Sequence, residues 1–175
     1  MNALKSFKSF LKGDNFFQQY LNGKDIYDFN DFEYARLTGL LNWHRGDTRN
    51  PNNVEPLVGM RKKYPNELVL PNKYRSLYRV TLSSSITNGT YRPKRKFASF
   101  TTSVEKARAF TKYDRAKESK VIIEIVPNPK DFVINPDFFD ALIDKEGSFF
   151  IEDHPESETL YIKTRPLKVT KQISV

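Results

Sequence analysis

The sequence predicts a single α+β domain in which a helical N-terminal third precedes a sheet-rich remainder. Up to about Trp43 the apolar residues recur at intervals of three and four, the spacing of one helix face. Beyond Asn72 the interval changes to two, the spacing of a half-buried strand. The length of 175 residues suits one domain with a sizeable core. We therefore expect one domain, with a helical and loop part at 1–72 and a β-rich part at 73–175.

The helical part opens with an amphipathic pattern. Within 1–11 the apolar residues share one helical face and lysines occupy most of the other. Such a segment either packs against its own domain or lies on a membrane surface. The stretch 42–72 is rich in asparagine and proline and predicts loops, with a short helix around Val58 to Tyr64.

Several segments of the β-rich part predict strands. The first, Leu77 to Leu82, alternates so that Arg79 lies on the face opposite Tyr78 and Val80. The others are Phe97–Thr101, Val121–Val126, and Glu158–Ile162 paired as a hairpin with Leu167–Ile173.

A helix is predicted between the second and third of these strands. The residues Thr102-Ser103-Val104-Glu105 match a capping box, with Thr102 as the N-cap and Glu105 at the third helical position. This capping role is sufficient by itself to explain the hydroxyl residues at the end of the preceding strand.

The amino-acid composition limits the kinds of catalytic and metal site that the chain can form. The chain has no cysteine and two histidines, so disulfides, thiolate zinc sites and a Ser-His-Asp triad have few or no candidates, and we expect no metal. The net charge of +8 favours encounters with nucleic acid or acidic proteins. The densest basic run, Arg92 to Lys96, lies between two predicted strands and is typical of a solvated loop. No stretch approaches the ~20 apolar residues of a membrane span, so a soluble protein is expected.

Two carboxylates, Glu156 and Glu158, stand two residues apart at the start of an apolar, β-prone run. On a strand they would share a face, roughly 6.6 Å apart. Like charges this close are unfavourable unless a cation, a proton or a ligand lies between them. The pair therefore indicates either a carboxylate active site or a solvated hairpin end with incidental acids.

The order of three motifs distinguishes these two interpretations. Tyr78-Arg79 comes first, Phe100-Thr101-Thr102-Ser103 second, and Glu156-Ser157-Glu158 third. In this order the chain resembles the arginine-specific mono-ADP-ribosyltransferases, which carry an aromatic-Arg, a Ser-Thr-Ser and a Glu-x-Glu motif. It looks most like the small bacteriophage members of that family. The resemblance spans roughly 74–175, with a threonine at 101 for the usual serine and Val80 where a glycine often follows the arginine.

The resemblance implies a split β-sandwich with an NAD-binding cleft, and transfer of ADP-ribose from NAD to arginine with release of nicotinamide. NAD is then a substrate, and no metal is required. In the family's pattern Glu158 and Glu156 are catalytic, Glu158 stabilising the ribose and Glu156 holding the incoming guanidinium. The cofactor-binding positions implied are Arg79, Thr101, Thr102 and Ser103.

Target recognition is implied for the loop before the glutamates. It contains Phe149, Phe150 and His154, and the two aromatic residues either cover a substrate side chain or pack the loop on the sheet. The partner expected is a host protein with an exposed arginine, in an acidic or nucleic-acid-associated complex, and the location expected is the host cytoplasm. Two alternatives stay open: an inactive binding module on the same scaffold, and ADP-ribosylation of nucleic acid.

Overall fold

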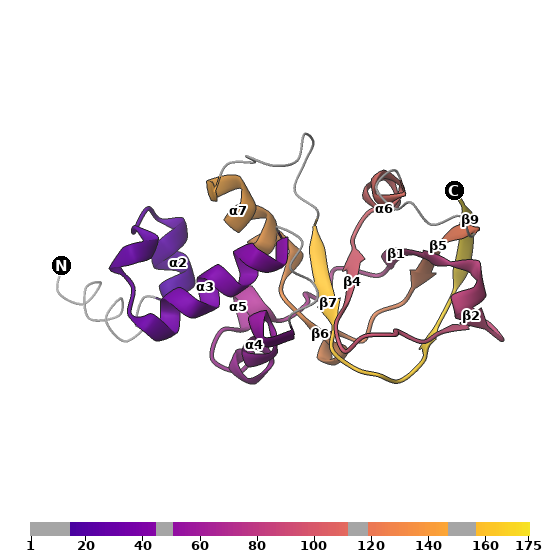
Figure 1. Ribbon diagram of the computed structural model, residues 1–175, viewed down its shortest axis with the longest axis horizontal. Coiled ribbons are helices and arrows are strands. Elements are labelled where there is room, and N and C mark those ends of the chain that lie inside the picture. Colours follow the sequence, from indigo (N-terminus) through magenta and orange to yellow (C-terminus); the bar gives the residue numbers. More distant parts are fainter. Residues whose placement is uncertain (1–14, 45–50, 112–118, 147–156) are drawn as a thin grey trace.

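A computed structural model of the chain describes residues 15–44, 51–111, 119–146 and 157–175. Most of the helices gather at one end of the elongated molecule, and two antiparallel sheets, with helix α6 beside them, occupy the rest, as Figure 1 shows. The predicted α+β fold is therefore confirmed.

The helical part is built from short elements. They are α2 (Phe16–Leu21), η1 (Ile26–Asp28), α3 (Asp31–His44), η2 (Pro51–Asn53), α4 (Glu55–Met60) and α5 (Pro65–Leu68). Asn15 caps α2, since its side chain accepts a hydrogen bond from the Phe17 N–H at 3.0 Å. The predicted helix at Val58–Tyr64 is displaced: α4 ends at Met60, and α5 starts with Pro65 in its first turn. The amphipathic segment 1–11 lies outside the described residues.

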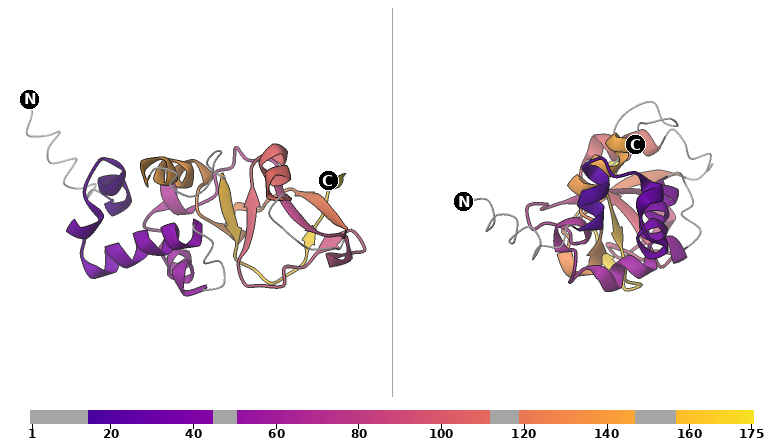
Figure 2. Two further views of the ribbon diagram at one scale, coloured as in Figure 1. Left: turned by 45° about the horizontal axis from the view of Figure 1, so that its top comes forward. Right: turned by 90° about the vertical axis from the view of Figure 1, so that its left-hand side faces the viewer.

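These helices enclose a core together with α7 (Pro136–Glu146). Its largest buried side chains include Phe17, Leu40 and Trp43 from the N-terminal part and Phe139 from α7. The two views of Figure 2 show α7 beside the N-terminal helices, against the edge of the sheet. The last third of the chain thus completes the core that the first third begins.

The larger sheet has six strands in the order β6-β7-β4-β1-β5-β9, with every neighbouring pair antiparallel. Their bounds are β6 (Phe132–Val133), β7 (Glu158–Tyr161), β4 (Ala98–Thr101), β1 (Leu77–Leu82), β5 (Lys120–Ile125) and β9 (Lys171–Ser174). Strands were predicted in all of these segments except β6. The strands that carry the three motifs, β7, β4 and β1, are direct neighbours.

The smaller sheet has the order β2-β3-β8. The hairpin of β2 (Ile86–Thr87) and β3 (Thr90–Tyr91) turns through Asn88 and Gly89, with φ of 50° and 70°. A type I′ hairpin turn requires positive φ at both turn residues, and Asn-Gly is the sequence that favours it. This sheet packs on one face of the larger one around Tyr91, Phe100 and Tyr161.

The predicted C-terminal hairpin is wrong. The segment after β7 forms β8 (Leu167–Lys168), which pairs with β3, and then β9, which pairs with β5. Both edges of β7 are occupied, by β4 and by β6, so no edge is left for an adjacent strand.

The predicted helix cap is displaced by one residue. The chain is still extended at Ser103 (φ −131°), and it is the Ser103 side chain that accepts from the Lys106 N–H, so α6 runs Val104–Phe110. Thr102 therefore precedes the cap. Helix α6 packs against β1, β4 and β5. In the described part of the chain no helix has the length and hydropathy of a membrane span.

Candidate functional site

The site is built where the larger sheet opens. Within the described residues, β1 pairs with β5 at six positions but with β4 at one, Tyr78 opposite Thr101. Past that position β1 and β4 separate. Register also aligns Thr101 with Glu158, so Tyr78, Thr101 and Glu158 follow one another across three strands on one face. Arg79, one residue along, lies on the other face, toward the smaller sheet.

Arg79 spans the opening with its guanidinium. Nε–H donates to the Tyr91 hydroxyl at 2.9 Å, and an Nη1–H donates to the Ser99 carbonyl at 2.6 Å. The guanidinium also lies 5.8 Å from the centre of the Tyr91 ring and 5.9 Å from that of Phe100. The Ser99 carbonyl belongs to β4 beyond the end of its pairing with β1, so the side chain supplies the hydrogen bond that β1 no longer gives.

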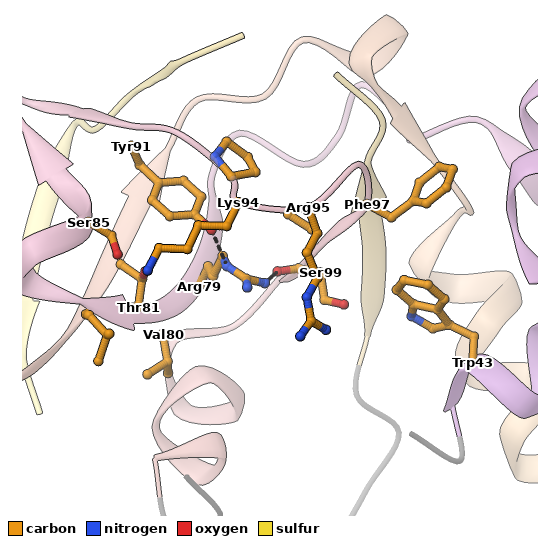
Figure 3. Close-up of a pocket in the computed structure, with 13 residues that line it drawn as sticks. Trp43, Arg79, Val80, Thr81, Ser85, Tyr91, Lys94, Arg95, Phe97 and Ser99 are labelled. Atoms are coloured by element: carbon orange, nitrogen blue, oxygen red, sulfur yellow. Dashed lines mark hydrogen bonds between the residues drawn. The ribbon is translucent and has the colours of Figure 1, made fainter. Parts of the chain in front are cut away.

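A pocket of about 310 Å³ lies at this opening. It is lined by β1 on one side, by β4 on the other, and by the loop that joins β3 to β4, with Trp43 of α3 at one end (Figure 3). Arg79, Lys94 and Arg95 bring three cationic side chains to it. The charged residues of the basic run at 92–96 are exposed, as expected of a loop, but two of them border the pocket rather than open solvent alone.

Glu158 begins β7 and is 6% exposed. Its Oε1 accepts a hydrogen bond from the Trp43 indole Nε1–H at 3.1 Å, and its carboxylate also shares a hydrogen bond with the Ser99 side chain. Burial raises the pKa of Glu158, while the hydrogen bonds from Ser99 and Trp43 and the charge of Arg79 act to lower it. The carboxylate is thus held by two side chains that line the pocket.

The three hydroxyl residues of the second motif have different surroundings. Thr101 is buried directly opposite Glu158 on the neighbouring strand. Thr102 is half-buried between the strand and the helix. The Ser103 hydroxyl is engaged at the start of α6, where it accepts from Lys106 N–H and donates to Glu105 Oε2 at 2.7 Å.

The residue before Glu158 is anchored from two helices. Asp140 of α7 accepts from the Ser157 N–H at 2.7 Å and from the Ser157 hydroxyl at 2.5 Å. Lys106 of α6 donates to the same hydroxyl and lies 3.7 Å from Asp140. Ser157 has φ of 45°, which is left-handed rather than extended. The chain is therefore not extended at Ser157, and β7 starts at Glu158, where the predicted strand starts.

Several predicted residues lie outside the described part of the chain. They are Glu156, Phe149, Phe150 and His154. Among the residues that the structure describes, no group of three or more His, Asp or Glu side chains is arranged to hold a metal ion.

Sequence reasoning missed Trp43, Ser99 and Tyr91. Ser99 carried a usable signal, because a residue two positions before Thr101 on a strand shares its face. Tyr91 and Trp43 carried none, since their partners lie 12 and 115 residues away in the chain.

Comparisons of this chain with protein-family models, with curated proteins and with solved structures gave no match. The function of the chain is therefore inferred from the geometry of the site and the order of the motifs.

Proposed function

We propose that this protein is a mono-ADP-ribosyltransferase that moves ADP-ribose from NAD to an arginine of a host target protein. The observation that carries the proposal is the adjacency of β1, β4 and β7. Arg79 of β1 and Ser99 of β4 line one pocket, and the buried Glu158 of β7 is hydrogen-bonded to two residues of its lining, Trp43 and Ser99. Thr101, Thr102 and Ser103 do not line this pocket.

The pocket suits a dinucleotide diphosphate. Arg79, Lys94 and Arg95 line it together with the hydroxyl residues Ser85 and Ser99. Guanidinium and ammonium groups bind phosphate oxygens through charge-assisted hydrogen bonds, and arginine does so with a planar fork. The packing of two antiparallel sheets on each other supports the split β-sandwich that the motifs imply.

Glu158 has the surroundings that the reaction needs. Cleavage of the bond between nicotinamide and ribose builds positive charge on C1′, and a fixed carboxylate stabilises such charge, as in glycosidases. Nicotinamide leaves as a neutral molecule with the electron pair of that bond. An arginine nitrogen then bonds to C1′ and gives up one proton, which leaves the product guanidinium charged.

Glu156 is assigned to the acceptor arginine by the motif order. A carboxylate that holds a guanidinium also assists the loss of its proton, which is needed because arginine has a pKa above ~12. When water replaces arginine as the nucleophile, no guanidinium has to be held or deprotonated. Removal of Glu156 should therefore reduce transfer to arginine more than NAD hydrolysis. The aromatic residues at 149 and 150, with His154, are proposed to contact the target.

The test is incubation of the protein with NAD labelled in its adenylate part and a bacterial lysate. Wild type is compared with Glu158→Gln, Glu156→Gln and a matched control, Glu33→Gln, which changes a half-buried glutamate on α3. Labelled bands are treated separately with protease and with nuclease, and labelled peptides are sequenced by mass spectrometry.

We expect wild type to label arginine and Glu158→Gln to give no label. We expect Glu156→Gln to lose labelling but to keep NAD hydrolysis. Label that only nuclease removes would move the proposal to a nucleic-acid acceptor, which the basic pocket edge would favour. Folded wild type that releases no nicotinamide would overturn it in favour of a binding module.

A further inference from the structure

Trp43 connects the helical part of the chain to the glutamate of the sheet. It lies near the C-terminal end of α3 and is 2% exposed. Its Nε1 is 3.1 Å from Glu158 Oε1, and the same indole lines the pocket beside the basic loop, as Figure 3 shows. One side chain therefore touches both the proposed catalytic group and the proposed substrate pocket.

We propose that Trp43 is a positioning residue for Glu158, which it holds in the orientation and charge state that NAD cleavage uses. The inference rests on the proposed function, since it assigns Trp43 a part in the same reaction. It also gives the helical part of the chain a role, because α3 delivers the indole to the site.

The direction of the indole is fixed by its packing. The ring meets Phe97 edge to face, with centroids 6.2 Å apart and planes at 84°, and it belongs to the helical core. A buried ring held on several sides keeps its N–H pointing one way. The carboxylate oxygen that accepts this bond is therefore held in place, and the second donor, Ser99, restrains it from the neighbouring strand.

The indole also favours the ionised carboxylate. An indole N–H only donates, so its bond is stronger to a carboxylate than to a protonated acid. This opposes the effect of burial on the Glu158 pKa. Among the described residues, the charged groups that face the start of β7 are Arg79 from β1, Lys106 from α6 and Asp140 from α7; the last two lie 3.7 Å apart and largely offset each other.

The first experiment compares the pH profile of NAD hydrolysis in wild type and Trp43→Phe, which keeps a ring and loses the donor. We expect kcat to fall about tenfold or more, with a smaller change in KM. The acid limb of the profile should move up by about one pH unit. Phe29→Leu is the control, because it removes a buried aromatic from the same core without touching Trp43 or Glu158. It should leave the acid limb in place.

The second experiment needs no activity. Trp43 is the chain's one tryptophan, so the tryptophan emission reports on the surroundings of this indole, and the comparison with Glu158→Gln isolates the part that depends on Glu158. We expect the emission of wild type to change with pH as Glu158 titrates, and the change to be absent in Glu158→Gln.

The outcomes separate this inference from the proposed function. If wild type is active and folded Trp43→Phe has the same kcat and the same acid limb of the pH profile, the inference is overturned and the proposed function stands. Identical emission titrations in wild type and Glu158→Gln would also overturn it, whether or not Trp43→Phe folds. Absence of NAD cleavage in wild type would count against the function, whereas the emission difference would still establish the coupling of Trp43 to Glu158.

Discussion

The helical core and the core between the sheets meet along β6 and β7, and they are assembled in different ways. Alternation along these strands turns Val133 and Leu160 to the helical core, and Phe132 and Tyr161 to the core between the sheets. In the helical core, aromatic side chains pack edge to face. At the border of this core, the Trp43 indole N–H donates a hydrogen bond to Glu158. The core between the sheets admits a charged group, since Arg79 lies against Tyr91 and Phe100.

This difference shows that the sheets and the helices contribute to the site in different ways. The sheets bring the motif residues together by strand pairing, and the helices fix them from outside through Trp43, Lys106 and Asp140. Substitutions in the sheets should therefore mainly lower the rate of NAD cleavage. Changes in the helices should act on the position of the strand that carries Glu158.

Among the changes that compare the sheets with the helices, the largest effect should come from Arg79→Lys, in the sheet. A lysine cannot bond the Tyr91 hydroxyl and the Ser99 carbonyl together while offering a fork to phosphate. We expect kcat/KM for NAD to fall about 10²-fold and the free energy of unfolding to fall by about 1–3 kcal/mol. Kinetics and urea unfolding measure both, with the exposed Arg75→Lys as control. Wild-type kinetics in Arg79→Lys would remove the arginine from the site.

A smaller effect is expected on the helical side from Asp140→Asn. One of the two acceptors for Ser157 and the charge facing Lys106 are lost. NAD hydrolysis should slow about tenfold, with a loss of about 1–2 kcal/mol in unfolding free energy. Asp144→Asn, one turn further along α7 and exposed, is the matched control. Equal effects of the two changes would mean that the helices do not position β7.

The parts of the fold that can be predicted from the sequence are those that depend on local interactions. Alternation at Leu77–Leu82 and the helical spacing up to Trp43 are local patterns, and both predicted elements form. Strand partners are chosen by free edges, which no local pattern shows, so the C-terminal hairpin was wrong. The cap moved from Thr102 to Ser103 because both residues can cap and the preceding strand decides where the chain stops being extended.

The candidate site was predictable in part for the same reason. Motif order indicated Arg79, Thr101 and Glu158, and the structure places them on neighbouring strands. The Trp43 contact joins elements 115 residues apart, and Ser157, with its positive φ, directly precedes β7. Neither has a signal in residue spacing.

A milder effect is expected at the basic edge of the pocket. Lys94→Ala and Arg95→Ala should each raise KM for NAD severalfold, with kcat nearly unchanged, because they act on phosphate binding and not on ribose. The increase should shrink at high salt, which screens exposed charges. Arg92→Ala removes an exposed charge of the same loop that does not line the pocket, and should change KM little. Equal effects of all three would indicate a general charge effect.

The smallest effect is thermodynamic and concerns Glu158. Its pKa is raised in the folded state, so its contribution to stability is most favourable below the unfolded pKa and is lost as pH rises through the folded pKa. Glu158→Gln has no such group. Its unfolding free energy relative to wild type should therefore increase with rising pH, by about 1.4 kcal/mol for each unit of raised pKa. Urea unfolding at several pH values measures the difference, and a difference that decreases with pH would contradict the burial of this carboxylate.

The central claim is that Glu158, held between the sheet and Trp43, drives cleavage of NAD. Nicotinamide release by the purified wild-type protein and by Glu158→Gln, at matched folded concentration and without any acceptor, tests it most directly. We predict measurable release by wild type and a loss of at least about 10²-fold in Glu158→Gln. Equal release by the two proteins would contradict the claim.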